Sequence, residues 1–131
     1  MSKAPLTIDP EGRWMAEVQR CRPYLEAAMA LGDSHTFTSI VQGLVAGRLL
    51  LWPGERSALL CEWQDGPRPV LHYFLGGGEM DEIARMEAEV TEWAKGMGFR
   101  RLTLYGRPGW SRSFLRERGW KSKWVVMEKE I

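Results

Sequence analysis

The sequence predicts one α+β domain, residues 1–131, in which a mixed β-sheet carries helices on both faces. Three observations predict this class. Apolar residues recur at helical spacing in the first third of the chain, three apolar runs joined by short turns follow, and a long amphipathic helix separates the third run from a fourth. A chain of 131 residues can bury roughly two thirds of its unfolded surface around a single core.

The N-terminal third is predicted to be mostly helical. Residues 4–8 precede it as a short first strand, and Asp9 followed by a proline marks a helix start. Pro23 is expected to break this helix or to begin a second one, because proline removes a backbone hydrogen bond inside a helix. Thr36 is expected to cap a further helix that Gly47 ends.

Three strands and a long helix are predicted for the middle of the chain. The apolar runs 48–52, 57–63 and 69–75 are separated by turns that contain proline and glycine, so they are expected to pair antiparallel. The triple glycine at 76–78 predicts a loop before a helix over 80–97, whose apolar residues form one stripe.

The last third is predicted to alternate strand, helix and strand. Residues 101–105 form a strand, a short helix begins at Gly109, and residues 123–131 form a terminal strand. A helix between the strands at 69–75 and 101–105 implies a parallel crossover, which makes the sheet mixed.

Charge is balanced overall but unevenly distributed. The formal net charge of +1 favours neither nucleic acid nor a membrane surface as a target. Residues 79–92 hold six acidic residues against Arg85, whereas residues 100–123 hold eight Lys or Arg against Glu117. We therefore expect one acidic and one basic region.

The two cysteines are predicted to be free thiols. Cys21 and Cys61 are forty residues apart, with no second cysteine or histidine at metal-ligand spacing, so neither a metal site nor a disulfide framework is expected. No apolar run reaches the ~18 residues of a membrane span, and the first residues lack the apolar core of a signal peptide. These features favour a cytoplasmic protein.

The order of elements resembles the GNAT (Gcn5-related N-acetyltransferase) fold across nearly the whole chain. The segments CRPYLEAAM, LLLWPGERSA, PVLHYFLGGGEMDEI, LTLYGRPGW and MEKEI are more specifically similar to small uncharacterised GNAT-like proteins of tailed phages and prophages. This resemblance implies phage structural or assembly proteins as partners and a location in the host cytoplasm or the virion. A homo-oligomer would follow if the acidic region of one copy paired with the basic region of another.

The resemblance also implies where acetyl-CoA would bind. In the family the strand before the long helix lies along the pantetheine arm, and the loop after it holds the pyrophosphate at the helix N-terminus. The family's Arg or Gln and its regular glycine spacing are missing here, and carboxylates at Glu79, Asp81 and Glu82 would repel a diphosphate. The positions that match the cofactor-binding segment are Phe74, Leu75, Gly76, Gly77, Gly78 and Met80.

Candidate catalytic residues follow from the chemistry of acetyl transfer, which needs a base for the amine and an acid for the leaving thiolate. Glu62 and His72 are the candidate bases. Family members often place the acid four residues before the glycine of a Gly-aromatic pair, where this sequence has Leu115, so Tyr105 or Tyr73 is the candidate acid.

Each of these motifs also has a purely structural interpretation. Three glycines tolerate the backbone conformations of a tight strand-to-helix turn without any ligand. His72 alternates with apolar neighbours on its strand, which is typical of a hydrogen-bonded sheet residue, and Glu62 on its own strand can face solvent.

The basic region suggests a surface for a partner. Arg112 and Arg116 lie four residues apart on the predicted last helix, with Arg107 before them and Trp110 interleaved. Such a cluster can track phosphates, remain a solvated face, or pair with an acidic patch in the same or a second copy; nucleic acid is the less favoured alternative.

The sequence as a whole favours a phage-type GNAT-like protein that acts by binding, as a virion or assembly component, with weak or no catalytic activity. The alternatives are an active acetyl-CoA-dependent N-acetyltransferase and a nucleic-acid-binding accessory protein that uses the basic C-terminal region.

Overall fold

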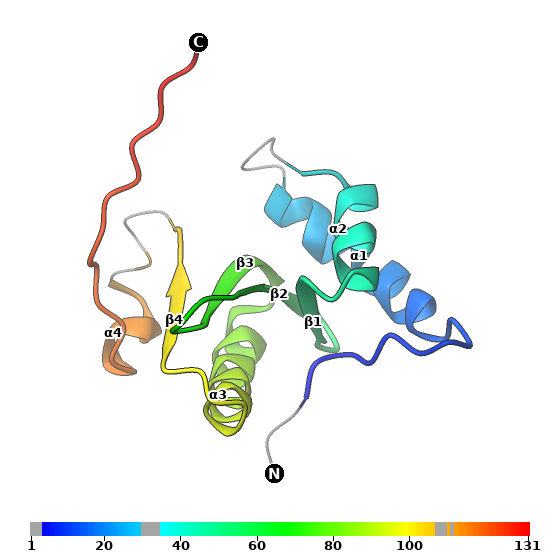
Figure 1. Ribbon diagram of the computed structural model, residues 1–131. Coiled ribbons are helices and arrows are strands. Elements are labelled where there is room, and N and C mark those ends of the chain that lie inside the picture. Colours follow the sequence, from blue (N-terminus) through cyan, green and yellow to red (C-terminus); the bar gives the residue numbers. More distant parts are fainter. Residues whose placement is uncertain (1–3, 30–34, 107–109, 111) are drawn as a thin grey trace.

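The computed structural model describes residues 4–29, 35–106, 110 and 112–131. It confirms the predicted class, because one four-stranded mixed sheet lies between helices (Figure 1). The elements, in chain order, are α1 (Trp14–Met29), α2 (Phe37–Val45), β1 (Leu49–Pro53), β2 (Ser57–Gln64), β3 (Val70–Gly78), α3 (Met80–Gly96), β4 (Arg101–Leu104) and α4 (Phe114–Glu117).

The sheet has the order β1-β2-β3-β4, in which the first three strands are antiparallel neighbours and β4 runs parallel to β3. Helices α1 and α2 cover one face, where Val18, Leu25 and Leu51 are fully buried. Helix α3 covers the opposite face, where it packs Val90 against Trp52 and Leu71. Because helices cover both faces of the sheet, consecutive residues of β2 are buried from Ser57 to Cys61, which agrees with the continuous apolar runs of the sequence.

Pro23 does not break α1, contrary to the sequence prediction, because the helix continues through it. Val18, Cys21 and Leu25 form one fully buried stripe on both sides of the proline, and Pro23 itself is exposed. The packing of that stripe outweighs the cost of a helix-interior proline, about 3 kcal/mol. The helix begins at Trp14, later than the start at Asp9 and the following proline that the sequence predicts, and the Asp9 carboxylate accepts a hydrogen bond from the Trp14 N–H at 3.2 Å.

Neither predicted terminal strand forms. The segment 4–8 makes one backbone hydrogen bond to the sheet, from the Leu6 N–H to the Leu51 carbonyl at 2.7 Å, and Pro5 has no N–H with which to extend the pairing. Residues 123–131 are exposed and have no regular secondary structure. The last predicted helix begins at Phe114, and Gly109 lies outside the described residues.

The predicted glycine loop is wrong, since 76–78 are the last residues of β3 and Glu79 alone separates that strand from α3. Strand β3 stays paired with β2 to its end, where Ser57 opposes Gly78. The helix predicted over 80–97 is confirmed as α3. The Thr36 cap of α2 is also confirmed, with the Thr36 hydroxyl accepting from the Ser39 N–H at 3.1 Å.

Candidate functional site

Strands β3 and β4 part in the middle of the sheet. Their pairing runs only from Val70 opposite Arg101 to Tyr73 opposite Leu104, whereas β3 continues to Gly78. A β-bulge opposite Leu60 and Cys61 shifts the β3 register at this point. Beyond Tyr73, no described strand pairs with the outer edge of β3. Bulges are common beside functional sites because they redirect the strand and its side chains.

A cavity of about 840 Å³ lies where the two strands part, and we call it the β3–β4 cavity. Residues from both faces of the sheet line it, including Met29 of α1 and Ile83 of α3, so it passes through the layer of strands. Its size is within the range of pockets that hold small molecules, about 300–1,000 Å³. The sequence-predicted residues that line it are Glu62, His72, Tyr73, Phe74, Leu75, Gly76, Tyr105 and Trp110.

The remaining predicted site residues lie elsewhere. Gly77, Gly78 and Met80 are outside the lining of the cavity, and so are Arg112 and Arg116, which are exposed. These two arginines make no ion pair with a described residue. Arg107 lies outside the described residues. Of the predicted partner-binding set, Trp110 lines the cavity.

His72 is held across three strands. It lies opposite Glu62 of β2 and Thr103 of β4, and its Nδ1 is 2.8 Å from the Thr103 hydroxyl. Burial lowers the pKa of His72, and the negative charge of Glu62 partly opposes this shift. The ring is therefore neutral near pH 7. The structural interpretation of His72 as a hydrogen-bonded sheet residue is confirmed, and the same contacts fix the ring beside the cavity.

Glu62 and Tyr105 flank His72. The Glu62 carboxylate is half-buried and accepts a hydrogen bond from the Gln64 side chain at 2.8 Å. The Tyr105 ring is 4.5 Å from the His72 ring, centroid to centroid, and remains largely exposed. The structure thus brings together the three predicted catalytic residues, although it shows no hydrogen bond between them.

Tyr73 has a hydroxyl that is buried and lacks a hydrogen-bond partner among the described residues. The residue lines the β3–β4 cavity, and its ring is 5.7 Å from the Trp120 ring. Burial raises the pKa of Tyr73, so the phenol keeps its proton. An unsatisfied buried hydroxyl costs about 1–3 kcal/mol, which makes this atom a candidate contact for a ligand.

The three glycines of β3 have separate structural reasons. A Cβ on Gly77 would overlap the Tyr24 carbonyl oxygen, so α1 packs directly on the strand backbone there. Gly78 has φ +115°, and a Cβ on it would overlap the Arg56 carbonyl. Gly76 differs, since its Cβ would lie 3.0 Å from the flexible Leu59 side chain, beside the cavity.

Two of the three carboxylates that precede or begin α3 bind the β1–β2 turn. Glu82 is buried and accepts hydrogen bonds from the Ser57 hydroxyl and from the Arg56 N–H, the latter at 2.9 Å. Burial alone would raise the pKa of Glu82, but these hydrogen bonds outweigh it and the pKa is lowered. Glu79 pairs with Arg56 at 2.8 Å, and Asp81 is exposed.

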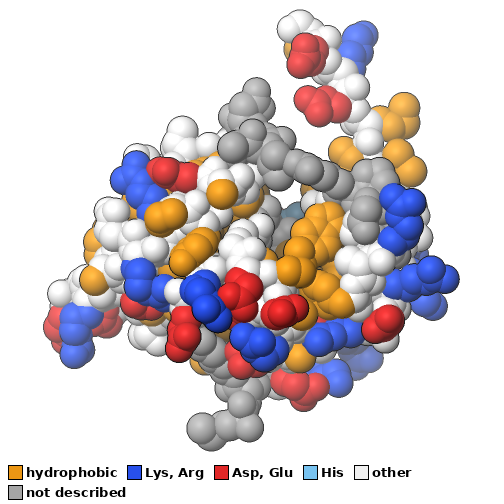
Figure 2. All heavy atoms as spheres, turned by 180° about the vertical axis from the view of Figure 1, so that it is seen from behind, with side chains coloured by type: hydrophobic (Ala, Val, Ile, Leu, Met, Phe, Trp, Pro, Cys, Tyr) orange, Lys and Arg blue, Asp and Glu red, His pale blue; other side chains and the backbone are white. Residues whose placement is uncertain are grey.

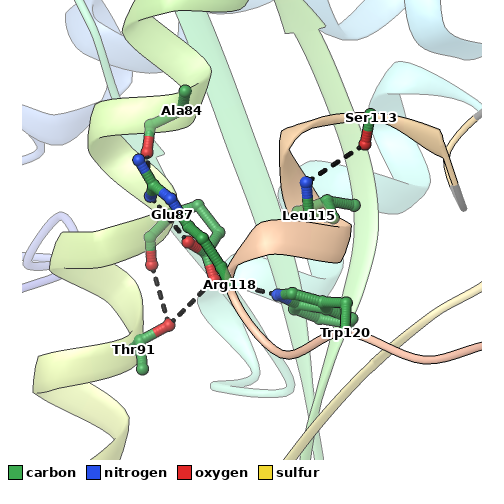
Figure 3. A network of polar contacts seen from close by, with 7 residues as sticks. All are labelled: Ala84, Glu87, Thr91, Ser113, Leu115, Arg118 and Trp120. Atoms are coloured by element: carbon green, nitrogen blue, oxygen red, sulfur yellow. Dashed lines mark hydrogen bonds and ion pairs between the residues drawn. The ribbon is translucent and has the colours of Figure 1, made fainter.

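The Gly119-Trp120 pair is anchored to α3 by Glu87 (Figure 3). The buried Glu87 carboxylate accepts hydrogen bonds from Arg118 at 2.8 Å, from the Trp120 indole at 3.0 Å and from Thr91 at 3.1 Å. Arg118 also donates to the Ala84 carbonyl. One cation of the basic region is thus paired with the acidic helix of the same chain, and Trp120 is held beside Tyr73.

Sequence reasoning missed Thr103, Glu87 and Trp120 as residues that shape this site. Thr103 lies two residues before Tyr105, so its place on the His72 face of β4 was available from strand alternation. Nothing in the sequence pointed to the contact of Glu87 with Trp120, because thirty-three residues separate them. In the described part of the chain, no three His, Cys, Asp or Glu side chains gather as metal ligands, and no helix could cross a membrane.

No protein-family model and no curated protein matches the sequence. Solved structures share the fold. An acetyltransferase of Trypanosoma brucei has a TM-score of 0.65 at 11% identity, over 87% of this chain and 94% of that chain. An aminoglycoside N-acetyltransferase in complex with CoA has a TM-score of 0.62 at 12% identity, over 88% and 90%. A ribosomal-protein-alanine N-acetyltransferase from Brucella melitensis has a TM-score of 0.59 at 12% identity, over 89% and 94%.

These similarities show that the chain has the GNAT acetyltransferase fold. They confirm the fold expected from the sequence resemblance. At such low identities they establish the architecture, and the chemistry must be argued from the β3–β4 cavity itself.

Proposed function

We propose that the protein is an acyl-CoA-dependent N-acyltransferase in which the thioester end of the donor lies in the β3–β4 cavity. The observation that carries this proposal is the set of groups around one cavity: the His72 imidazole, the Glu62 carboxylate and the Tyr73 hydroxyl, which has no hydrogen-bond partner among the described residues. A solved structure of similar fold, the aminoglycoside N-acetyltransferase, contains CoA, which supports an acyl-CoA donor.

The edge of β3 offers a binding surface for the donor's arm. From Phe74 to Gly78, no described strand pairs with this edge, so its backbone groups are free to pair with an extended, amide-containing chain in the manner of an added strand. Phe74 and Leu75 add apolar lining. This segment fits the pantetheine arm of CoA.

The diphosphate of CoA fits less well. Strand β3 passes into α3 through Glu79 alone, so there is no loop to surround a phosphate, and Asp81 exposes a further negative charge. The β1–β2 turn does engage Glu79 and Glu82, which reduces the repulsion expected from the sequence. We therefore expect the acyl and pantetheine parts of the donor to supply most of the affinity.

Proton movements are assigned to residues of the cavity. An amine acceptor must lose a proton as its nitrogen bonds to the acyl carbon and the carbon–sulfur bond breaks, and neutral His72 accepts that proton. Thr103 fixes the ring, and the Glu62 carboxylate favours the imidazolium that forms. The protonated Tyr73 hydroxyl donates a hydrogen bond to the negative charge that develops on oxygen or sulfur.

Donor binding is tested by thermal unfolding with saturating acetyl-CoA. We expect a higher Tm for the wild type, since a ligand at about 100 times its Kd stabilises by about 2.7 kcal/mol. Gly76→Glu, which places a charged side chain beside the cavity, should abolish the shift. Gly96→Glu is the matched control, because a side chain there meets nothing within 4 Å. Gly77 is unsuitable for this test, since any side chain would overlap α1.

The outcome distinguishes donor binding from its absence. Equal shifts in the wild type and Gly76→Glu would place acetyl-CoA outside the cavity, and no wild-type shift would contradict the proposal. Release of free thiol from acetyl-CoA, measured with a panel of amines, then tests transfer, and His72→Ala should reduce it at unchanged donor affinity.

A second candidate function is binding without catalysis, and the missing phosphate loop favours it. In this case the exposed Arg112 and Arg116 contact a partner, which the sequence resemblance suggests is a phage structural or assembly protein. A wild-type protein that ignores acetyl-CoA, yet co-purifies with such a protein until both arginines are changed to glutamate, would support this function over the first.

A further inference from the structure

The β3–β4 cavity has two parts of different polarity, because it crosses the sheet. Phe74 packs against the core under α1 and α2, whereas its neighbour Tyr73 packs against the core under α3. His72 lies on the same face of β3 as Phe74, since side chains alternate along a strand, and Glu62 is opposite His72. The groups assigned to the acceptor amine therefore lie on the α1 side of the sheet.

The part of the cavity on the α3 side is apolar, and we call it the α3 chamber. It is lined by Leu59, Tyr73, Ile83 and Phe114. Leu59 and Ile83 are only 3% and 7% exposed, although both line the cavity. Figure 2 shows hydrophobic side chains beside a hollow on one face of the molecule. The cavity thus continues from the surface into the core under α3.

The polar groups near the α3 chamber leave little place for a charged ligand. Glu87 also lines the cavity, but its carboxylate is already bound by Arg118 and Trp120. None of the described residues that line the cavity is lysine or arginine. The Tyr73 hydroxyl is buried and has no hydrogen-bond partner among the described residues. The chamber therefore suits an uncharged apolar group whose polar end reaches Tyr73.

An acetyl group matches this chamber poorly. It brings a single methyl group, which contacts only a small part of the apolar lining. The remaining space would lose van der Waals contacts, and water fills a site well only when several polar partners surround it. A longer apolar chain would cover the lining that acetyl leaves without contacts.

We infer that the donor is a CoA thioester of an unbranched, uncharged acyl group longer than acetyl, from butyryl to octanoyl, whose chain lies in the α3 chamber. This inference rests on the proposed function. The thioester carbonyl lies at Tyr73, and the amine approaches from the side of His72. As the carbon–nitrogen bond forms and the carbon–sulfur bond breaks, the amine proton passes to His72, and the leaving thiolate of CoA takes a proton from water.

The inference is tested by calorimetric titration of the full chain with acetyl-, butyryl-, hexanoyl- and octanoyl-CoA. We expect the Kd to fall about fourfold for each added methylene until the chamber is filled. Succinyl-CoA is the matched control for butyryl-CoA, because its acyl group has the same number of carbons and ends in a carboxylate. It should bind at least tenfold more weakly than butyryl-CoA.

A substitution in the wall locates the chain. Ile83→Phe narrows the α3 chamber, so the ratio of octanoyl-CoA affinity to acetyl-CoA affinity should fall at least tenfold. Met97→Phe is the control, because Met97 is 51% exposed just after the same helix and should keep the wild-type ratio. An unchanged ratio in Ile83→Phe would place the chain outside the chamber and overturn the inference.

The titrations separate this inference from the proposed function. If acetyl-CoA binds and affinity does not rise with chain length, or if succinyl-CoA binds as well as butyryl-CoA, the inference is overturned and the proposed function stands. If none of the CoA thioesters binds, the proposed function fails, and the inference fails with it.

Discussion

The last residues of β3 and its middle contrast in how completely their polar groups are satisfied. Where β3 meets α3, Gly77 and Gly78 allow close backbone packing, and Glu82 fills the β1–β2 turn with hydrogen bonds. Where β3 parts from β4, the Tyr73 hydroxyl is buried without a partner in the described chain and a cavity crosses the sheet. The end of the strand is packed for stability, and its middle leaves an unsatisfied group that a ligand can use.

The largest expected effect comes from filling the packed end. Gly78→Val should destabilise the protein by about 3 kcal/mol or more, because it combines a strained backbone conformation with overlap against the β1–β2 turn. Urea unfolding measures this change. Gly96→Ala, in open space on α3, should not destabilise; equal losses in the two variants would contradict the packing described for Gly78.

Removing the Glu82 carboxylate should cost about 1.5–3 kcal/mol, since the charged acceptor for the buried Ser57 hydroxyl and the part-buried Arg56 N–H is lost. Glu82→Ala is compared with Asp81→Ala, an exposed neighbour whose loss should be small. The folded-state pKa of Glu82 lies below its usual 4.5, so its contribution is present above about that pH and disappears as pH falls through the lowered value. The two variants should therefore differ at pH 7 and converge in acid.

Tyr73→Phe should keep or raise the stability of the protein and lower its transferase activity. It removes a buried hydroxyl that has no partner, so the free energy of unfolding should stay equal or rise by up to about 1 kcal/mol. Thiol release from acetyl-CoA should fall at least tenfold. A loss of stability would show that the hydroxyl has a partner in the folded protein, and unchanged transfer would exclude its proposed role.

The smallest expected effect is the pH dependence of stability that results from the titration of His72. Its folded-state pKa lies below the usual 6.5 because burial disfavours the charged ring, so the unfolded chain binds more protons as pH falls below that value. Stability should be complete above pH 6.5 and decline below it, and His72→Gln should flatten this part of the Tm profile. As the proposed base, His72 should also keep transfer active to lower pH than an ordinary histidine would.

Local patterns predicted most elements. The apolar stripe of α3, the Thr36 cap and the tight turns between β1, β2 and β3 each depend on neighbours within a few residues, and each was found as expected. The wrong predictions concern segments whose structure depends on contacts with residues far away in the sequence. Pro23 is tolerated because the sheet buries both halves of α1, and the glycines extend β3 because β2 pairs with them to the end.

The candidate site was only partly predictable. Glu62, His72 and Tyr105 were chosen from side-chain chemistry, and strand register then placed Glu62 opposite His72. The cavity itself could not be read from the sequence, because it results from a bulge and from the early end of β3–β4 pairing. Phage and virion roles remain predictions from resemblance.

The sequence by itself determined the order of the elements from α1 to α4, the parallel crossover through α3, and the segment from Val70 to Gly96 on which the sheet and the site depend. Only the tertiary structure decided that this segment contains no phosphate loop, that Glu79 and Glu82 bind Arg56 and Ser57, and that β3 separates from β4. The physical reason is that periodicity and capping are local, whereas packing, burial and strand register depend on residues far apart in the chain.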